Sequence, residues 1–158
     1  MAEPHKVHVP LGDRAYDILI GPALLESAGD ILRSRFLGRR FGIVTDTNVA
    51  SQQLSRLTRS LTTAGLDFAE ITVPAGEASK SWSRLGEVVE AILAARLERG
   101  DVILALGGGV IGDLAGFAAA IARRGMDFVQ LPTSLLAQVD SSVGGKTGIN
   151  SPHGKNLL

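Results

Sequence analysis

Apolar positions along the chain alternate between the spacing of strands and the spacing of helices. Short apolar runs of strand length occupy 41–44, 68–73, 102–106 and 128–131, and apolar residues recur at helical spacing in 49–64, 83–97, 110–123 and 134–139. In the first of these helical segments, for example, the repeating residues are Leu54, Leu57 and Leu61. Strands that are apolar on both faces and alternate with helices are typical of a parallel sheet covered by helices. The pattern therefore predicts a Rossmann-like α/β fold.

The N-terminal part of the chain has a different pattern. Residues 7–10 and 16–20 alternate apolar and polar side chains on either side of 11–14, which predicts a β-hairpin. Residues 23–34 then have helical spacing. With 158 residues and no long repeat or low-complexity linker, the chain is expected to form one domain over residues 1–158.

Composition narrows the partners that this domain can have. Sixteen basic and sixteen acidic residues leave no net charge, which argues against nucleic acid or an anionic membrane as a partner. The lack of cysteine excludes disulfides and thiolate metal sites. Residues 102–122 have the length of a membrane span, but they include Asp113 and a glycine triplet, so we predict a buried strand, turn and helix instead. We expect a soluble, cytoplasmic domain.

The predicted strands all end in polar or glycine-rich segments. These segments are 45–48, 74–80, 107–113 and 132–134. Ligands of open parallel sheets bind at the carboxyl ends of the strands. The convergence therefore predicts a ligand site at this edge of the sheet.

The segment at 107–113 matches the glycine fingerprint of dinucleotide-binding proteins. Gly107, Gly109 and Gly112 follow an apolar strand and open a helix, where glycines let the backbone approach a pyrophosphate and free N–H groups face its charge. A tight strand-to-helix turn also needs glycine. The fingerprint further expects an acidic residue after the next strand, whereas Asp127 precedes that strand. We favour the phosphate cradle and keep the tight turn as the alternative.

Charged residues near the strand ends have both functional and structural interpretations. Asp46 can accept the hydroxyls of a ribose or cap a helix. Asp113 lies on the first turn of a predicted helix, where a carboxylate favours the helix dipole without any ligand. Glu77 and Lys80 flank a turn, and a solvated ion pair between them is the structural alternative to a binding role.

Two lysines near the C-terminus indicate an anion site. Residues 144–147 resemble a P-loop, but Asp140 stands where that motif requires a glycine, and a proline and a glycine break the stretch that follows. We therefore reject a P-loop. Lys146 and Lys155 lie instead on irregular backbone with Asp140 and Asn156 nearby, an arrangement that favours a site for phosphate or carboxylate over solvated side chains.

The histidines do not have the spacing of metal ligands. His5 and His8 lie in the first predicted strand, and His153 lies in the C-terminal loop. No carboxylate stands at ligand spacing from them. We expect no complete metal site in this chain.

Taken together, these motifs resemble the N-terminal, NAD-binding half of the 3-dehydroquinate synthases of the shikimate pathway, which are sugar-phosphate cyclases. The resemblance is dense in Pro–Ala–Gly–Glu–Ala–Ser–Lys at 74–80, in Gly–Gly–Gly–Val–Ile–Gly–Asp–Leu–Ala–Gly–Phe at 107–117, and at 131–150 and 154–158. Within 131–150, the run at 139–147 is far more specific than the glycine loop. The sequence at 45–49 extends the resemblance upstream.

The resemblance implies a reaction and a set of site residues. Such an enzyme converts 3-deoxy-D-arabino-heptulosonate 7-phosphate, a sugar-acid phosphate, to 3-dehydroquinate and phosphate by transient oxidation with NAD, phosphate elimination, re-reduction and aldol closure. Asp140, Lys146 and Asn156 would face the substrate, and Arg124 would reach the phosphate in a neighbouring subunit of a homodimer. The residues that would bind NAD are Asp46, Asn48, Gly76, Glu77, Lys80, Gly108, Gly109, Val110, Gly112, Asp113, Thr133, Ser134 and Lys155.

The resemblance also implies a second, helical domain that this chain does not contain. That domain would hold a divalent metal, zinc or cobalt, with a glutamate and two histidines. Because 156–158 resembles the opening of another element, we expect the protein to continue, and we expect the bare surfaces of 134–139 and 143–158 to self-associate or to be disordered. The alternatives are a domain of a related sugar-phosphate cyclase or polyol dehydrogenase, and a nucleotide-binding module without catalysis.

Overall fold

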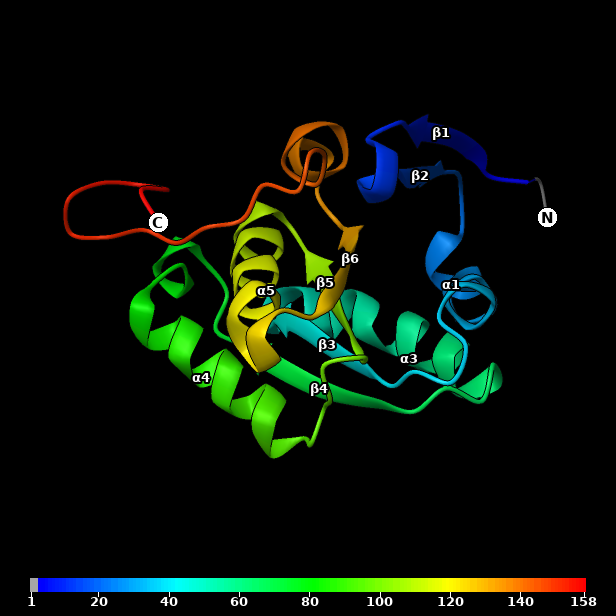
Figure 1. Ribbon diagram of the computed structural model, residues 1–158, viewed down its shortest axis with the longest axis horizontal. Coiled ribbons are helices and arrows are strands. Elements are labelled where there is room, and N and C mark those ends of the chain that lie inside the picture. Colours follow the sequence, from blue (N-terminus) through cyan, green and yellow to red (C-terminus); the bar gives the residue numbers. More distant parts are fainter. Residues whose placement is uncertain (1–2) are drawn as a thin grey trace.

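A four-stranded parallel sheet forms the centre of the protein (Figure 1). The computed structural model describes residues 3–158. The strands are β3 (Phe41–Asp46), β4 (Phe68–Val73), β5 (Val102–Gly107) and β6 (Asp127–Pro132), in the order β4-β3-β5-β6. Every residue of the central strand β5 is buried, as its continuous apolar run predicted. The Rossmann-like α/β prediction is confirmed.

Helices cover both faces of this sheet (Figure 1). The helices α4 (Trp82–Ala94) and α5 (Gly109–Ile121) pack on one face, against Val44 and Ile103. On the other face, α1 (Leu24–Arg35) and α3 (Ser55–Thr63) pack against Phe41 and Leu104. The odd and even residues of each strand thus enter two separate apolar layers, which fix the sheet between them.

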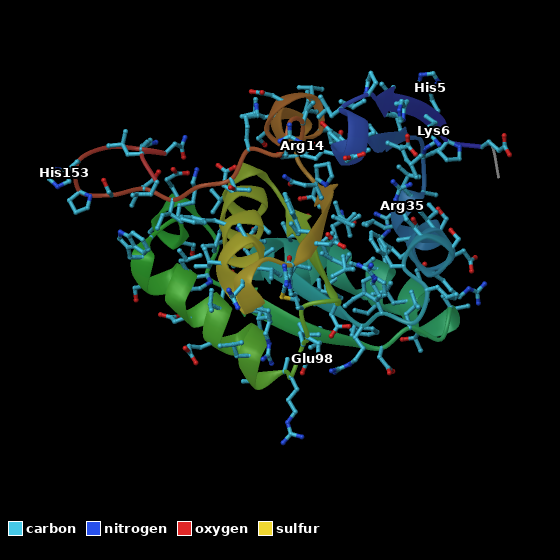
Figure 2. All side chains as sticks on the ribbon, viewed as in Figure 1. His5, Lys6, Arg14, Arg35, Glu98 and His153 are labelled. Carbon is cyan, nitrogen blue, oxygen red and sulfur yellow. The ribbon has the colours of Figure 1, made fainter. Side chains whose placement is uncertain are left out.

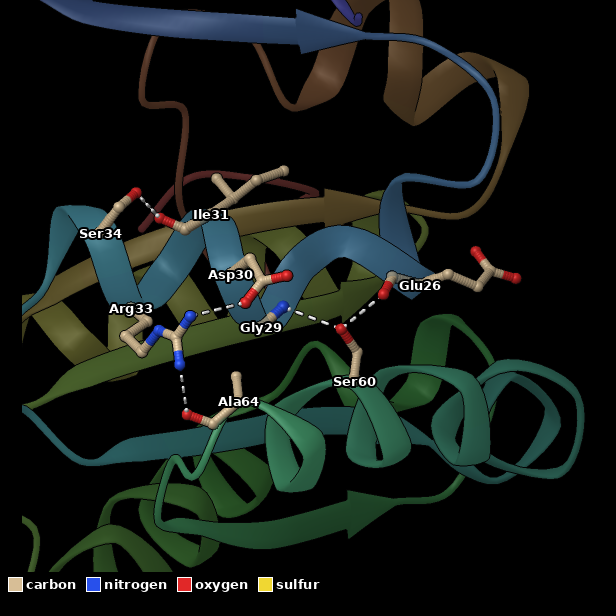
Figure 3. Close-up of polar contacts among 8 residues, drawn as sticks. All are labelled: Glu26, Gly29, Asp30, Ile31, Arg33, Ser34, Ser60 and Ala64. Atoms are coloured by element: carbon tan, nitrogen blue, oxygen red, sulfur yellow. Dashed lines mark hydrogen bonds and ion pairs between the residues drawn. The ribbon is translucent and has the colours of Figure 1, made fainter. Parts of the chain in front are cut away.

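The helices α1 and α3 cross at very short range (Figure 3). The backbone N–H of Gly29 donates to Ser60 Oγ at 2.9 Å, and Ser60 Oγ donates to the carbonyl of Glu26 at 2.8 Å. A Cβ added at Gly29 would lie 2.2 Å from the carbonyl oxygen of Ser60. Only glycine therefore allows the two backbones to approach this closely.

The N-terminal strands form the predicted antiparallel hairpin. The strands are β1 (His5–Val9) and β2 (Tyr16–Ile20), joined through a 3₁₀ turn at Gly12–Arg14. The first strand begins two residues before the predicted start because His5 pairs with Ile20.

One carboxylate connects this hairpin to the first helix. Asp17 accepts hydrogen bonds from Lys6 and His8 within the hairpin and from Arg35 of α1. Lys6, then His8, together lower the pKa of Asp17 from 3.8 to about 2.

Element boundaries differ from the sequence predictions at several places. The helix predicted at 49–64 begins earlier, with α2 (Thr47–Val49), and passes through a π-helical stretch, Ala50–Leu54, before α3. The helix predicted at 83–97 ends at Ala94, where the left-handed φ of Arg96 (54°) stops it. The last strand includes Asp127, and the short helix predicted at 134–139 runs over 135–141, with Ala137–Ser141 π-helical. Across residues 3–158, no helix combines the length and apolar character needed to cross a bilayer.

Candidate functional site

The glycine loop joins β5 to α5 at the carboxyl edge of the sheet. Gly108 is the N-cap residue of α5 and has no side chain to bond to the first N–H groups of the helix. The first helical hydrogen bond runs from the N–H of Gly112 to the carbonyl of Gly108 at 3.0 Å. The N–H groups before Gly112, including that of Val110, therefore have no helical acceptor. A Cβ at Gly109 would lie 3.1 Å from Ser141 Oγ, and one at Gly108 would lie 3.3 Å from Ser134 Oγ. The loop is thus a narrow cradle whose first N–H groups have no acceptor among residues 3–158, with two hydroxyls beside it.

Packing at the strand-to-helix corner requires glycine at position 107, where a Cβ would lie 2.6 Å from Ile111 Cβ. The tight-turn interpretation therefore holds for Gly107. Gly112 lies inside α5, and a Cβ there would meet Gln130 Oε1 at 2.5 Å, which is the end of a flexible side chain that can move. The cradle interpretation applies to Gly108 and Gly109, whose surroundings are looser.

Lys80 connects three segments of the site. Its ammonium donates to Asp113 Oδ2 at 2.7 Å and also to the side-chain carbonyl of Asn156. The Lys80 side chain is only 5% exposed and that of Asp113 is 16% exposed. The prediction of a solvated pair between Glu77 and Lys80 is therefore wrong, because Lys80 is buried and its carboxylate partner is Asp113.

Glu77 contacts a residue that the sequence did not single out. Its Oε1 accepts a hydrogen bond from Asn150 Nδ2 at 2.7 Å, and Asn150 Oδ1 in turn accepts from the backbone N–H of Asn156 at 3.0 Å. Gly76, with a φ of 107°, turns the chain just before Glu77. The C-terminal loop passes α5 and reaches this turn before α4 (Figure 1). Of the predicted residues, Glu77, Lys80, Asp113 and Asn156 thus lie in one hydrogen-bonded cluster.

Asp46 has the structural role that the sequence left open. Its Oδ1 accepts hydrogen bonds from the backbone N–H groups of Asn48 at 2.9 Å and Val49 at 3.0 Å, so it caps α2. Within residues 3–158, both hydrogen bonds that this carboxylate accepts go to Oδ1. The ribose role stays a prediction, since the second oxygen can still accept from a ligand.

A second charged pair joins the π-helical stretch after β6 to the loop that follows it. Lys146 Nζ donates to Asp140 Oδ1, and the two side chains are 54% and 62% exposed. The loop between them is tied to the hairpin, because the backbone N–H of Gly144 donates to Tyr16 Oη at 3.0 Å. The chain that leads from β6 into the π-helical stretch starts beside the glycine loop, because the Thr133 N–H donates to the carbonyl of Gly107 at 3.0 Å.

Two of the predicted residues lie apart from these clusters. Arg124 follows the C-terminal end of α5, so the length of that helix, about 20 Å, separates it from the glycine loop. Lys155 is exposed on the C-terminal loop. Asp127 lies at the opposite edge of the sheet, where it pairs with Arg39 at 2.6 Å. It therefore cannot act as the acidic residue of a dinucleotide fingerprint.

The C-terminal segment is less bare than its sequence suggested. Gly148 and Ile149 are buried, and the N–H of Ile149 donates to the carbonyl of Leu158 at 2.9 Å. Part of this segment is therefore packed against the domain, and the expectation that 134–139 and 143–158 self-associate or are disordered stays a prediction. Exposed apolar side chains remain at Leu135, Leu136 and Val139 (75%, 67% and 67%).

The histidines and carboxylates do not gather into a metal site. Over residues 3–158, no group of three or more such side chains is placed to hold an ion. His5 and His153 lie at opposite ends of the molecule (Figure 2). Residues 3–158 thus do not fit a divalent metal.

Comparison with known proteins identifies the family. Residues 70–158, more than half of the chain, match the family described as 3-dehydroquinate synthase N-terminal. The chain belongs to the 3-dehydroquinate synthase family. It is 64% identical to the 3-dehydroquinate synthase of Mesorhizobium japonicum over 99% of its own length and 41% of that relative, and 61% identical to that of Brucella ovis over 100% of its length and 42% of the relative. The chain therefore spans about two fifths of these synthases.

Solved structures of related cyclases share the fold. A 2-deoxy-scyllo-inosose synthase, crystallised with carbaglucose-6-phosphate, NAD⁺ and Co²⁺, matches 98% of this chain and 41% of its own with a TM-score of 0.88 and 26% identity. A 2-epi-5-epi-valiolone synthase from Streptomyces hygroscopicus with NAD⁺ and Zn²⁺ covers 94% of this chain and 41% of its own, with a TM-score of 0.82 and 35% identity. An iron-containing alcohol dehydrogenase, at 20% identity and a TM-score of 0.60, shares the fold alone.

Sequence reasoning missed two polar residues of the synthase domain. Asn150 bonds to two predicted residues, Glu77 and Asn156, and Ser141 Oγ lies beside Gly109. No periodicity or charge pattern marks either residue. The only available signal was their position inside the dense motif at 131–150.

Proposed function

We propose that this chain is the NAD⁺-binding part of a 3-dehydroquinate synthase, which converts 3-deoxy-D-arabino-heptulosonate 7-phosphate to 3-dehydroquinate and phosphate. The observation that carries the proposal is the buried Lys80, which bonds to Asp113 on the first turn of α5 and to Asn156 on the C-terminal loop. These bonds join two residues predicted to bind NAD, Lys80 and Asp113, to one predicted to face the substrate, Asn156. All three lie at the carboxyl edge of the sheet, beside the glycine cradle. The 64% identity to a synthase supports this substrate over those of other cyclases.

In this proposal the cofactor's pyrophosphate lies on the glycine cradle. The free N–H groups of Gly109 and Val110 donate to it, with the helix dipole adding a favourable charge. Asp46 accepts from a ribose hydroxyl with the oxygen that its helix cap does not use. When bound, NAD⁺ supplies a hydride acceptor for a ring hydroxyl of the substrate.

The substrate lies next to the cofactor and is held by Lys146. The ammonium of Lys146 supplies a point charge for the phosphate or carboxylate of the substrate, while Lys155 faces NAD⁺. Asp140 orients the Lys146 ammonium through their ion pair, and Asn156 presents a polar side chain from the C-terminal loop. Arg124 lies too far from this edge to join it, so we propose that it serves a second subunit of a homodimer.

The metal belongs to a different part of the synthase in this proposal. The described residues do not form a site for it, whereas related cyclases were crystallised with Co²⁺ or Zn²⁺. We therefore assign the ligands of a zinc or cobalt ion to a second domain outside these 158 residues. A catalytic zinc usually needs three protein ligands, so this chain alone should not catalyse the reaction.

A chimaera tests the whole proposal. The matching N-terminal region of the Mesorhizobium japonicum synthase is replaced by this chain, and phosphate release from the heptulosonate phosphate is measured with and without NAD⁺. We expect NAD⁺-dependent release, and a loss of about 100-fold or more in Lys146→Met, the size expected when a group that holds the transition state is removed.

The matched control is Arg99→Met, which removes an exposed cation before β5, at the opposite edge of the sheet. Its rate should stay within about twofold of the parent chimaera, because surface charges remote from a site contribute little. A folded chimaera that releases no phosphate, or releases it equally without NAD⁺, contradicts the proposal. Oxidation of a simple polyol in place of phosphate release points to the dehydrogenase alternative.

A further inference from the structure

Asn150 is the one side chain that bonds to both the Glu77–Lys80 turn and the C-terminal loop, among the contacts found in residues 3–158. Its Nδ2 donates to Glu77 Oε1 at 2.7 Å and its Oδ1 accepts from the backbone N–H of Asn156 at 3.0 Å. Its own backbone N–H donates to the carbonyl of Lys80 at 3.0 Å. Three hydrogen bonds thus tie one residue to both segments.

The chemistry of these partners matches an amide at position 150. An ionised carboxylate only accepts hydrogen bonds, so Glu77 needs a donor, and a backbone N–H only donates, so Asn156 needs an acceptor. The side-chain amide offers both on one rigid plane. An aspartate of the same shape would still offer an acceptor to the Asn156 N–H, but its carboxylate would repel that of Glu77 and the side chain would move out of place.

The bonds of Asn150 also act on Lys80. Asn156 accepts from the Lys80 ammonium with its side chain while its backbone is held by Asn150. The loop itself is closed behind this point, since Ser151 and Gly154 exchange backbone hydrogen bonds at 3.0 and 3.1 Å. Releasing Asn150 would therefore free Glu77, Asn156 and one acceptor of Lys80 together.

We propose that Asn150 is a positioning residue that couples the cofactor side of the site to the substrate side. It contacts neither ligand, but it sets the places of Glu77 and Asn156, and this role rests on the proposed function of those residues. Since coupling between two sites is reciprocal, NAD⁺ held at Glu77 and Lys80 should also order the loop that carries Asn156.

The test combines hydrogen exchange with NAD⁺ affinity, on the full 158-residue chain. In Asn150→Ala, protection of the Asn156 N–H should fall about 5- to 10-fold, the size expected for one hydrogen bond. The dissociation constant for NAD⁺ in calorimetry should rise by a similar factor. Saturating NAD⁺ should raise Asn156 protection in the parent chain and leave it unchanged in the variant. Exchange of the buried amide of Leu104 is the control for global stability.

Reversing the direction of the hydrogen bond between side chains 77 and 150 should restore the protection of the Asn156 N–H. Asn150→Asp alone should lose Asn156 protection, because two carboxylates repel. Adding Glu77→Gln places a donor opposite the introduced carboxylate, and protection should return to within about twofold of the parent, a change well below the worth of one hydrogen bond. The NAD⁺ affinity of this double variant should equal that of Glu77→Gln alone, which isolates the direct contribution of Glu77.

The outcomes separate this proposal from the proposed function. Unchanged Asn156 protection in Asn150→Ala overturns the positioning role, and so does lost protection with unchanged NAD⁺ affinity. Failure of the double variant to recover protection overturns it as well. A parent chain that binds no NAD⁺ at millimolar concentration overturns the proposed function and the coupling with it.

Discussion

Replacing Gly29 by alanine should destabilise the protein by separating α1 from α3. The added Cβ would lie 2.2 Å from the Ser60 carbonyl oxygen and 2.8 Å from Ala64 Cβ (Figure 3 shows this crossing). Both neighbours are backbone or directly attached to it, so no side-chain rotation can relieve the clash. The helices must move apart by about 1.3 Å to bring the 2.2 Å approach to an ordinary contact distance of about 3.5 Å.

Three contributions set the size of this effect. Overpacking costs about 1–3 kcal/mol, and the two hydrogen bonds through Ser60 Oγ contribute about 1 kcal/mol each. Alanine has a better helix propensity than glycine by about 1 kcal/mol, which offsets part of the loss. The net expectation is a destabilisation of about 2–4 kcal/mol, which lowers the Tm of a domain of this size by about 5–15 °C.

Urea unfolding followed by circular dichroism measures this difference, with Gly86→Ala as the matched control. Gly86 lies exposed in α4 with nothing within 4 Å of an added Cβ, so that substitution should stabilise the protein by about 0.5–1 kcal/mol. The reasoning is refuted if Gly29→Ala leaves the free energy of unfolding unchanged or raises it as Gly86→Ala does.

Three further predictions concern the buried Lys80–Asp113 pair, the Asp17 carboxylate and an exposed apolar surface. Lys80→Met should cost about 2–4 kcal/mol because it leaves the Asp113 carboxylate without its cation, and adding Asp113→Leu should recover most of the loss; additive single effects in urea unfolding would argue against this pair. Since neighbouring cations hold the pKa of Asp17 at about 2, below its ordinary 3.8, its stabilising contribution is present above about pH 4 and is lost as the pH falls towards 2. Urea curves of the parent and Asp17→Asn should therefore converge near pH 2, and a constant gap across this range would contradict the assignment. The exposed Leu135 and Val139 should promote association that depends on concentration, so sedimentation should show larger species in the parent than in a Leu135→Asp/Val139→Asp variant, unless the parent is strictly monomeric.

The sheet and its helices were predictable because they depend on local periodicity. The run at 102–106 is apolar at every position, and the structure buries all of it as the central strand. The helix boundaries were less accurate, since the end at Ala94 depends on the left-handed backbone of Arg96, which no apolar pattern encodes.

The position of the site was also predictable, but its contacts were not. The topology of a parallel sheet places all strand ends at one edge, so glycine and polar residues at those ends indicated a shared site. The partner of Lys80 depends instead on where the C-terminal loop runs in space. Asp113 and Asn156 lie 33 and 76 residues further along the chain, and sequence spacing alone favoured the nearer Glu77.

Binding of NAD⁺ at the carboxyl edge of the sheet is the central claim, and an NMR titration of the 158-residue chain tests it most directly. Backbone amide shifts should change at Gly108, Gly109 and Asp113 as NAD⁺ is added up to millimolar concentration. Asp127, at the opposite edge, should not move. No shift changes in a folded sample, or changes confined to the Asp127 edge, would contradict the account.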